Sequence, residues 1–147
     1  MRNSLGDEIM AVVFDEFVIS TSKRHEVIDI TTKVEDFIRN AQIENGVCII
    51  HVPHATLAVI TDEDEPGLNQ DYIAQFLRIV PENNNYKHDK IDNNAHSHIL
   101  SAILGANKMF PIRNGALVRG TWQNILLIEL DGPRSQRKVV LEALGDA

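Results

Sequence analysis

The chain has 147 residues, of which 44% are hydrophobic and 24% charged, and it carries a formal net charge of -7 with a pI near 5.3. This size and composition predict one globular domain over residues 1–147, with residues 1–9 disordered. The acidic charge argues against a nucleic acid or a membrane surface as partner. The single cysteine, Cys48, lies in an apolar run, which predicts a buried thiol in a reducing, cytoplasmic setting.

Two strands and a helix are predicted first. Residues 11–20 are rich in β-branched and aromatic side chains, and residues 25–30 alternate polar with apolar residues, so both stretches predict strands. The second strand would begin at a surface residue, His25. Thr32 and Glu35 match a capping box, and apolar residues at helical spacing follow them, which predicts a short amphipathic helix.

The next two strands carry the first pair of neighbouring histidines. Residues 46–53 form a nearly continuous apolar run, which predicts a central strand, and residues 55–61 predict another. His51 and His54 are three residues apart in this extended region, so they should point to opposite faces. We therefore expect that they do not share a site, and that His51 packs in the core or against a partner strand.

An acidic group introduces the strongest helix pattern of the chain. Asp64 or Glu65 can cap a helix that has Pro66 in its first turn. Apolar residues then recur at the spacing of one helix face until Val80, and Pro81 ends the pattern.

The segment from Tyr86 to Gly105 demands a chemical explanation. It places His88, His96 and His98 in a polar stretch with Asp89, and histidine is the commonest metal ligand and general base near neutral pH. A solvated loop with incidental histidines is the alternative. The helix that follows is expected to begin with Ser97 as its N-cap and to end at Gly105. His96 and His98 would point about 200° apart on it, so only one is expected to be central.

The remaining chain predicts antiparallel strands. Residues 108–113 and 116–119 flank Asn114-Gly115, a strong hairpin signal, and further strands are predicted over residues 124–130 and 137–143. Together the elements predict an α+β domain with a large, mostly antiparallel sheet and two or three short helices.

Several of these residues carry a resemblance to the YjbQ family, also called the secondary thiamine-phosphate synthase family, over nearly the whole chain. The matching pieces include His54-Ala55-Thr56, Asp62-Glu63-Asp64, Val80-Pro81, Tyr86-x-His88-Asp89, Ser97-His98, Leu104-Gly105, Gly115, Gly120-Thr121-Trp122-Gln123, Glu129 and the stretch 134–138.

The resemblance implies a compact α+β subunit, a homotrimer with pockets near the subunit contacts, and formation of thiamine phosphate from a pyrimidine diphosphate and a thiazole phosphate with release of pyrophosphate. It places His54, His88 and His98 at the motif histidines and Glu63 at the motif acid. His96 matches a histidine found in only some members.

The chain departs from the family pattern at two positions. Ala55 stands where the family often carries a hydroxyl, and Ala116 stands where it tends to carry an arginine after the hairpin glycine. If that arginine binds phosphate, Arg113 or Arg119 has to replace it here.

Two chemical interpretations follow from this residue set. Imidazoles of His54, His88 and His98 could hold a divalent metal such as zinc, with an open position and with Glu63 as general base or as a group that orients the ligands. Alternatively, a metal-free pocket could hold the anion of a small phosphorylated or heteroaromatic metabolite. That pocket would use the same imidazoles and the substrate-binding residues Ser97, Arg119, Thr121 and Gln123.

Release of pyrophosphate would need Mg²⁺ or several cations, and Asp62, Glu63 and Asp89 could supply oxygen ligands to that ion. Trp122 is interpreted equally well as a core aromatic or as part of a pocket for a heteroaromatic ring. Because strand residues alternate between faces, Thr121 and Gln123 are expected to face the site together and Trp122 to face away. A non-catalytic trimer that binds a metal ion or phosphate is the alternative function.

Overall fold

The structure is a computed structural model that describes residues 10–146. The prediction of disorder for residues 1–9 lies outside the described residues. In chain order the elements are β1 (Met10–Ile19), β2 (Glu26–Asp29), α1 (Thr31–Ala41), β3 (Asn45–His51), β4 (Leu57–Asp62), α2 (Pro66–Ile79), the short 3-10 helix η1 (Lys87–Lys90), α3 (Ala95–Leu104), β5 (Asn107–Arg113), β6 (Ala116–Leu117), β7 (Asn124–Glu129) and β8 (Arg137–Asp146).

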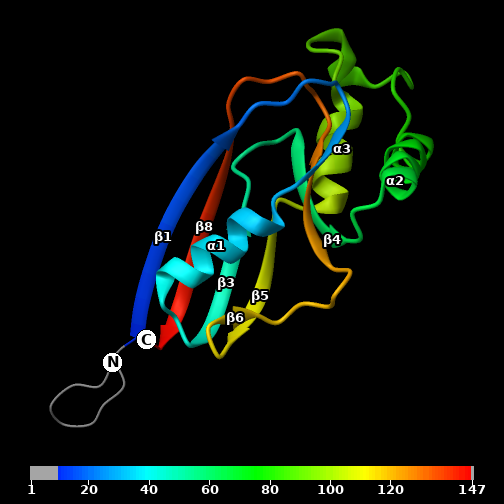
Figure 1. The fold of residues 1–147 in the computed structure, drawn as a ribbon. Coiled ribbons are helices and arrows are strands. Elements are labelled where there is room, and N and C mark those ends of the chain that lie inside the picture. The colour runs from blue at the N-terminus through cyan, green and yellow to red at the C-terminus, as the bar shows by residue number, and fades with distance from the viewer. Residues whose placement is uncertain (1–9, 147) are drawn as a thin grey trace, which may run out of the picture.

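The strands form two sheets, and every strand pair is antiparallel. The larger sheet has the order β1-β8-β3-β5-β6, and the smaller one has the order β2-β7-β4. β1 and β8 run side by side along their full length, so Met10 pairs with Asp146. Figure 1 shows α1 lying over the larger sheet, with α2 and α3 gathered at the other end of the molecule beside β4. The predicted α+β fold with an antiparallel sheet is confirmed.

Two apolar cores hold these layers together. The main core lies between α1 and the sheets, and Val34 and Phe37 of α1 pack there with buried residues of both sheets. The second core lies on the opposite face of the smaller sheet, where Ala58 and Ile128 pack with Leu100 of α3. Because β7 is buried on both faces, its sequence is a continuous apolar run rather than an alternating one.

The hairpin between β5 and β6 is formed as predicted. Asn114 and Gly115 both adopt positive φ, 52° and 74°, which is the conformation that the Asn-Gly pair favours in a tight hairpin. The returning strand is shorter than predicted, because β6 ends at Leu117 and only Val118 N–H still bonds to the backbone of β5. The chain then leaves the sheet, so Arg119 reaches α1 instead.

Two predicted helix starts are wrong, and both have the same cause. α1 begins at Thr31, and its N-cap residue, Ile30, has no side chain that can cap the helix. Asp29 accepts the Thr31 N–H instead, at 2.9 Å. The predicted capping box is not formed, since Glu35 pairs with Arg119. α3 begins at Ala95 rather than after Ser97, and Asp89 accepts the Ala95 N–H at 2.9 Å. In each case a carboxylate outside the helix takes the role of the cap.

Ser97 therefore lies inside the first turn of α3 and has a packing role. It is fully buried, and its hydroxyl donates to the backbone carbonyl of Leu130 at 2.5 Å. The other helix ends agree with prediction. Glu65 is the N-cap of α2 and accepts the N–H groups of Gly67 and Leu68, and α3 ends at Gly105 with φ of 98°.

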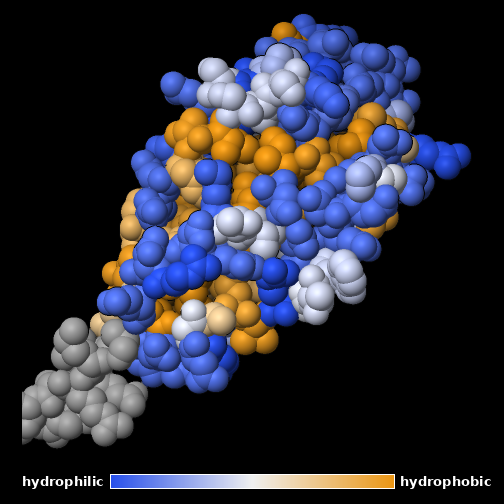
Figure 2. Space-filling model, in the orientation of Figure 1, coloured by the Kyte–Doolittle hydropathy of each residue, from blue (hydrophilic) through white to orange (hydrophobic). Residues whose placement is uncertain are grey.

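The larger sheet exposes apolar side chains on the face away from α1. They belong to β1, β5 and β8, and the exposed members are Met10, Val12, Phe14, Val18, Met109 and Leu144. Figure 2 views the side that α1 covers, where apolar surface is also visible above and below that helix. No helix of the described residues is both long and apolar enough to cross a membrane.

Candidate functional site

The predicted histidine pair forms between η1 and α3. The rings of His88 and His98 meet edge to face, with centroids 4.8 Å apart and an interplanar angle of 82°. Nε2 of His88 is shielded from solvent and has no hydrogen-bond partner, and Asp92 Oδ2 lies 3.8 Å from it. Buried polar atoms are rarely left without a partner, so this nitrogen marks a candidate binding position for an ion or a substrate atom.

A second histidine pair lies on the other side of α3. Nε2 of His96 lies 2.9 Å from Nε2 of His25, and Glu82 Oε1 lies 3.8 Å from the latter nitrogen. His96 is 1% exposed and the side chain of His25 is 11% exposed. The prediction that His25 is a surface residue is therefore wrong, because the chain that leads into β2 folds back over α3. Burial lowers the pKa of both imidazoles, which favours their neutral form.

Charged and polar groups surround this second pair. Arg24 contacts the other oxygen of Glu82, Oε2, at 3.5 Å, and it also reaches Asp131 Oδ1 at 3.3 Å. Asp131 is held in turn by Asn94 Nδ2 at 2.8 Å and by Arg134 Nη2 at 2.9 Å. Burial opposes ionisation of Asp131, but these contacts outweigh it and lower the pKa of the carboxyl group.

His54 lies elsewhere, on the connection between β3 and β4. Its Nε2 accepts the backbone N–H of Lys138 at 2.8 Å, so this nitrogen is already engaged. The ring lines a small hollow of about 270 Å³ that is otherwise formed by residues 134–137. Burial and the nearby Arg137 charge lower the pKa of His54.

The Gly-Thr-Trp-Gln block forms an exposed turn rather than a strand. Gln123 closes the turn, because its Oε1 accepts the Gly120 N–H at 2.8 Å. Trp122 is 70% exposed, so its interpretation as a core aromatic is wrong. The alternating faces expected for this block do not apply, since it does not run as a strand. Thr121 lies at the edge of a hollow of about 390 Å³ that reaches α1.

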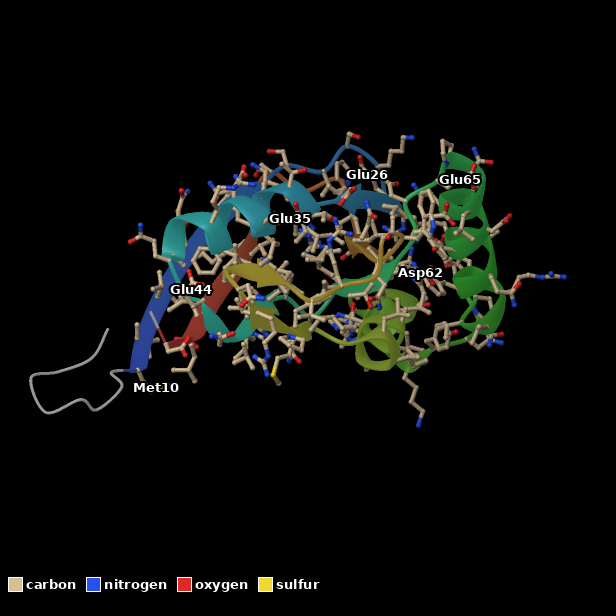
Figure 3. The ribbon with its side chains drawn as sticks, turned by 60° about the horizontal axis from the view of Figure 1, so that its bottom comes forward. Met10, Glu26, Glu35, Glu44, Asp62 and Glu65 are labelled. Carbon is tan, nitrogen blue, oxygen red and sulfur yellow. The ribbon has the colours of Figure 1, made fainter. Side chains whose placement is uncertain are left out.

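Arg119 anchors that turn to α1. Its Nε and Nη2 donate to Glu35 Oε1 at 2.9 and 2.6 Å, and its Nη1 donates to Gln123 O at 3.1 Å. In Figure 3, Glu35 lies on α1, whereas Asp62 and Glu65 lie at the α2 end of the molecule. The hollow lined by Arg119 and Thr121 is thus built on a different part of the fold from the acidic group.

The acidic residues of the family motif have local partners. Asp62 Oδ1 accepts the Glu63 N–H at 2.8 Å, and Tyr72 donates its hydroxyl to Glu63 O at 3.0 Å. Asp89 caps α3, as described above. Asp62 and Asp89 therefore bind backbone groups in this state, and the proposed Mg²⁺ site that they would form with Glu63 stays a prediction.

The predicted site residues thus occupy five places in one chain: the His88–His98 pair, the His25–His96 pair, the hollow beside His54, the turn at Thr121, and the acidic group with Glu63. Among residues 10–146, the only group of three His, Cys, Asp or Glu ligand atoms within 4.8 Å of one another is His25, Glu82 and His96. A metal site shared by His54, His88 and His98 stays a prediction that requires a second copy of the chain or a rearrangement.

Sequence reasoning missed His25 and Glu82. Neither lies in a compact metal motif, and His25 is 71 residues from its partner. One sequence feature could have pointed to this second pair. His96 lies at the start of an apolar helix pattern, where a buried side chain is expected.

Over residues 10–146, the fold and these sites define a class: an α+β domain with two antiparallel sheets, three α-helices and paired histidines around α3. A family model described as "UPF0047 protein YjbQ-like" matches residues 15–146. The chain therefore belongs to the YjbQ/UPF0047 family.

Relatives and solved structures agree with this assignment. A UPF0047 protein from Archaeoglobus fulgidus is 40% identical over 129 residues, covering 88% of this chain and 99% of the relative. The UPF0047 protein YugU of Bacillus subtilis is 36% identical, over 80% of this chain and 89% of its own. A YbjQ-like protein of unknown function from Sulfolobus solfataricus P2 is 45% identical in sequence to this chain. Its crystal structure superimposes with a TM-score of 0.93, over 94% of this chain and 100% of the Sulfolobus chain.

Proposed function

We propose that this protein is a small-metabolite enzyme that acts on a phosphorylated, heteroaromatic substrate at the His88–His98 pair. The observation that carries the proposal is the buried, unpartnered Nε2 of His88 against the His98 ring. An imidazole with a free nitrogen can accept or donate a proton near neutral pH, and two of them side by side can also bind one anionic oxygen.

The surroundings of the pair favour an anionic substrate. η1 also carries the exposed Lys87 and Lys90, which are close to His88 along the chain. Lysine binds phosphate as a mobile point charge, which suits a group that leaves as pyrophosphate. The carboxylate of Asp92, whose Oδ2 lies 3.8 Å from Nε2 of His88, would help to orient the imidazole.

The specific reaction proposed is that of a thiamine-phosphate synthase. A bond forms between the thiazole nitrogen and the methylene carbon of the pyrimidine, while the bond from that carbon to the diphosphate oxygen breaks and pyrophosphate leaves with the electron pair. The charge on the leaving group requires Mg²⁺ or several cations. The support for this reaction is the family resemblance together with the cationic and imidazole groups around His88.

We also propose that the working form is a homotrimer, in the cytoplasm, where the free Cys48 would remain reduced. The apolar outer face of the larger sheet supports self-association, because isolated monomers rarely expose such contiguous apolar surface. Assembly would also provide a way for the His88–His98 pair of one chain to meet the His54 hollow or the Thr121 turn of another.

The alternative function is a non-catalytic trimer that binds phosphate or a metal ion. The specific observation in its favour is that Oδ1 of both Asp62 and Asp89 accepts a backbone N–H, which leaves only Oδ2 of each carboxylate for Mg²⁺. Such a protein would bind the anion at the same histidines without turning it over.

A steady-state assay with hydroxymethylpyrimidine diphosphate, thiazole phosphate and Mg²⁺ tests the proposal. We expect release of pyrophosphate, and we expect His98→Gln to lower kcat/KM by about 10²–10⁴-fold, the usual effect of losing an acid–base group. His51→Gln is the matched control, since that half-buried histidine lies on β3 and should leave the rate unchanged.

Product formation that survives both His88→Gln and His98→Gln would contradict the role of the pair. If no product forms at high enzyme concentration with any divalent metal, the proposal of a synthase reaction is excluded. Calorimetric titration with inorganic phosphate then tests the alternative: binding that is lost in His98→Gln supports a binding protein.

A further inference from the structure

A second site, which the proposed function does not use, lies on the opposite side of α3. It joins three segments that are far apart in the chain: His25 from the connection between β1 and β2, Glu82 from the chain after α2, and His96 from the first turn of α3. Their ligand atoms all lie within 4.8 Å of one another. The connection before β2 is held over the start of α3, because Gly132 N–H donates to Arg24 O and Arg24 Nη2 donates to Asn93 O, each at 3.0 Å.

We propose that His25, His96 and Glu82 bind one divalent transition-metal ion of the zinc class. Two imidazole nitrogens and one carboxylate oxygen form a donor set that zinc uses in sites with an open fourth position. The inference goes beyond the proposed function and does not rest on it, since none of these three residues belongs to the His88–His98 pair.

The distances fit a small ion between the three side chains. Tetrahedral zinc with bonds of about 2.0–2.1 Å holds its ligand atoms about 3.3 Å apart. The two Nε2 atoms are 2.9 Å apart, and Glu82 Oε1 is 3.8 Å from Nε2 of His25, so the observed separations lie on either side of that value. Small rotations of side chains, without movement of the backbone, would bring all three atoms to bonding distance.

His25 and His96 each point their Nε2 atom toward the other ring. Without an ion, one Nε2 has to carry a proton and donate it to the lone pair of the other, because two facing lone pairs repel. The hydroxyl of Ser97 cannot donate a hydrogen bond to His96 Nε2, 3.3 Å away, because it already donates to Leu130 O. A metal ion would accept every lone pair that points into this space.

The groups behind the ligands support the orientation of Glu82. Arg24 contacts Oε2 of Glu82 at 3.5 Å and leaves Oε1 facing His25. Arg24 is itself held by Asp131 Oδ1 at 3.3 Å and by Asn93 O at 3.0 Å. Partners of this kind fix a ligand in the orientation that a metal requires. His96 is buried, whereas the Glu82 side chain is 35% exposed, so an ion can enter from the Glu82 side.

A bound ion would tie the connection before β2 and the chain after α2 to the start of α3. We therefore expect it to stabilise this end of the fold, because a ligand that binds only the folded state shifts the unfolding equilibrium. The open fourth position would hold water.

The test uses the full chain after treatment with a chelator. It is titrated with Zn²⁺ by calorimetry, and separately with Co²⁺, whose visible absorption reports tetrahedral coordination. We expect one ion per chain and a higher thermal midpoint. We expect His25→Gln and Glu82→Gln each to weaken zinc binding on the order of tenfold or more. These two residues are chosen because His96 is almost fully buried and its replacement could prevent folding.

His51→Gln is the matched control, since it removes a half-buried histidine of β3 that belongs to none of the proposed sites. Zinc binding that is kept in His51→Gln and weakened in both His25→Gln and Glu82→Gln supports the site. Absence of zinc binding to the wild-type chain would overturn it. So would wild-type affinity in His25→Gln or in Glu82→Gln, or loss of binding in His98→Gln instead, which would place the ion at the other histidine pair. None of these readouts depends on the thiamine-phosphate assay.

Discussion

Arg137 and Glu129 form an ion pair inside the protein, where the carboxylate is 0% exposed. Nε of Arg137 donates to Glu129 Oε2 at 2.8 Å, and Nη2 donates to Oε1 and to Thr56 Oγ1. The N–H groups of Leu130 and Asp131 donate to the same carboxylate at 3.0 Å. Burial opposes its ionisation, but Arg137 and these hydrogen bonds outweigh burial and lower the pKa of Glu129.

We predict that Arg137→Met destabilises the protein by about 3–5 kcal/mol, because it leaves a buried carboxylate without its counter-charge. Urea unfolding followed by circular dichroism measures this loss. The control is Arg39→Met, which breaks an exposed pair with Asp36 that is worth only about 0–1 kcal/mol. Equal effects of the two substitutions would show that the buried pair contributes no more than a surface one.

We predict that the free energy of unfolding decreases as the pH falls below about 6.5. Folded His54 has a lowered pKa because of burial and the Arg137 charge, whereas unfolded His54 titrates near 6.5. The unfolded state then binds more protons than the folded state, so protonation favours unfolding until the folded pKa is reached.

Denaturant unfolding at a series of pH values from 7.5 to about 5 measures this slope. His54→Gln should make it shallower, since glutamine does not titrate. An identical slope in the variant would show that His54 does not carry the effect.

We predict that Phe14→Glu reduces the proposed homotrimer to smaller species, because it places a charge on the exposed apolar face of the larger sheet. Light scattering coupled to size-exclusion chromatography measures the mass in solution. Asp15→Lys is the matched control, since the neighbouring residue of a strand points to the opposite face. A monomeric wild-type chain would contradict the trimer directly.

We predict that Cys48 does not react with a thiol reagent in the native protein. It is fully buried, and burial raises the pKa of its thiol to about 12, so the reactive thiolate is absent at pH 8. A colorimetric thiol assay at that pH should detect no cysteine before unfolding and one per chain in denaturant. Rapid reaction of the folded protein would mean that the main core opens readily around β3.

The sequence alone determined most of the elements, because the signals that set them act over a few residues. Asp64 or Glu65 before Pro66 marked the start of α2, Gly105 marked the end of α3, and Asn114-Gly115 marked the hairpin. Each of these residues prefers a backbone conformation or a hydrogen bond that does not depend on the rest of the fold.

Helix starts that depend on a residue outside the helix could not be found in this way. Asp89 caps α3 from η1, so the pattern around Ser97 alone pointed to the wrong residue. The alternating faces expected for the Gly-Thr-Trp-Gln block were also wrong. Gln123 closes this block as a turn, and Arg119 ties it to Glu35, which is 84 residues away along the chain.

Which histidines meet was decided only by the tertiary structure. Helical geometry predicted that His96 and His98 would point to different sides of α3, and they do. The partner of His98 is ten residues away in the chain, whereas His96 meets His25 because the connection from β1 to β2 crosses the start of α3. Short-range patterns determine the direction in which a side chain points, but the packing of the two sheets and the helices determines what it contacts.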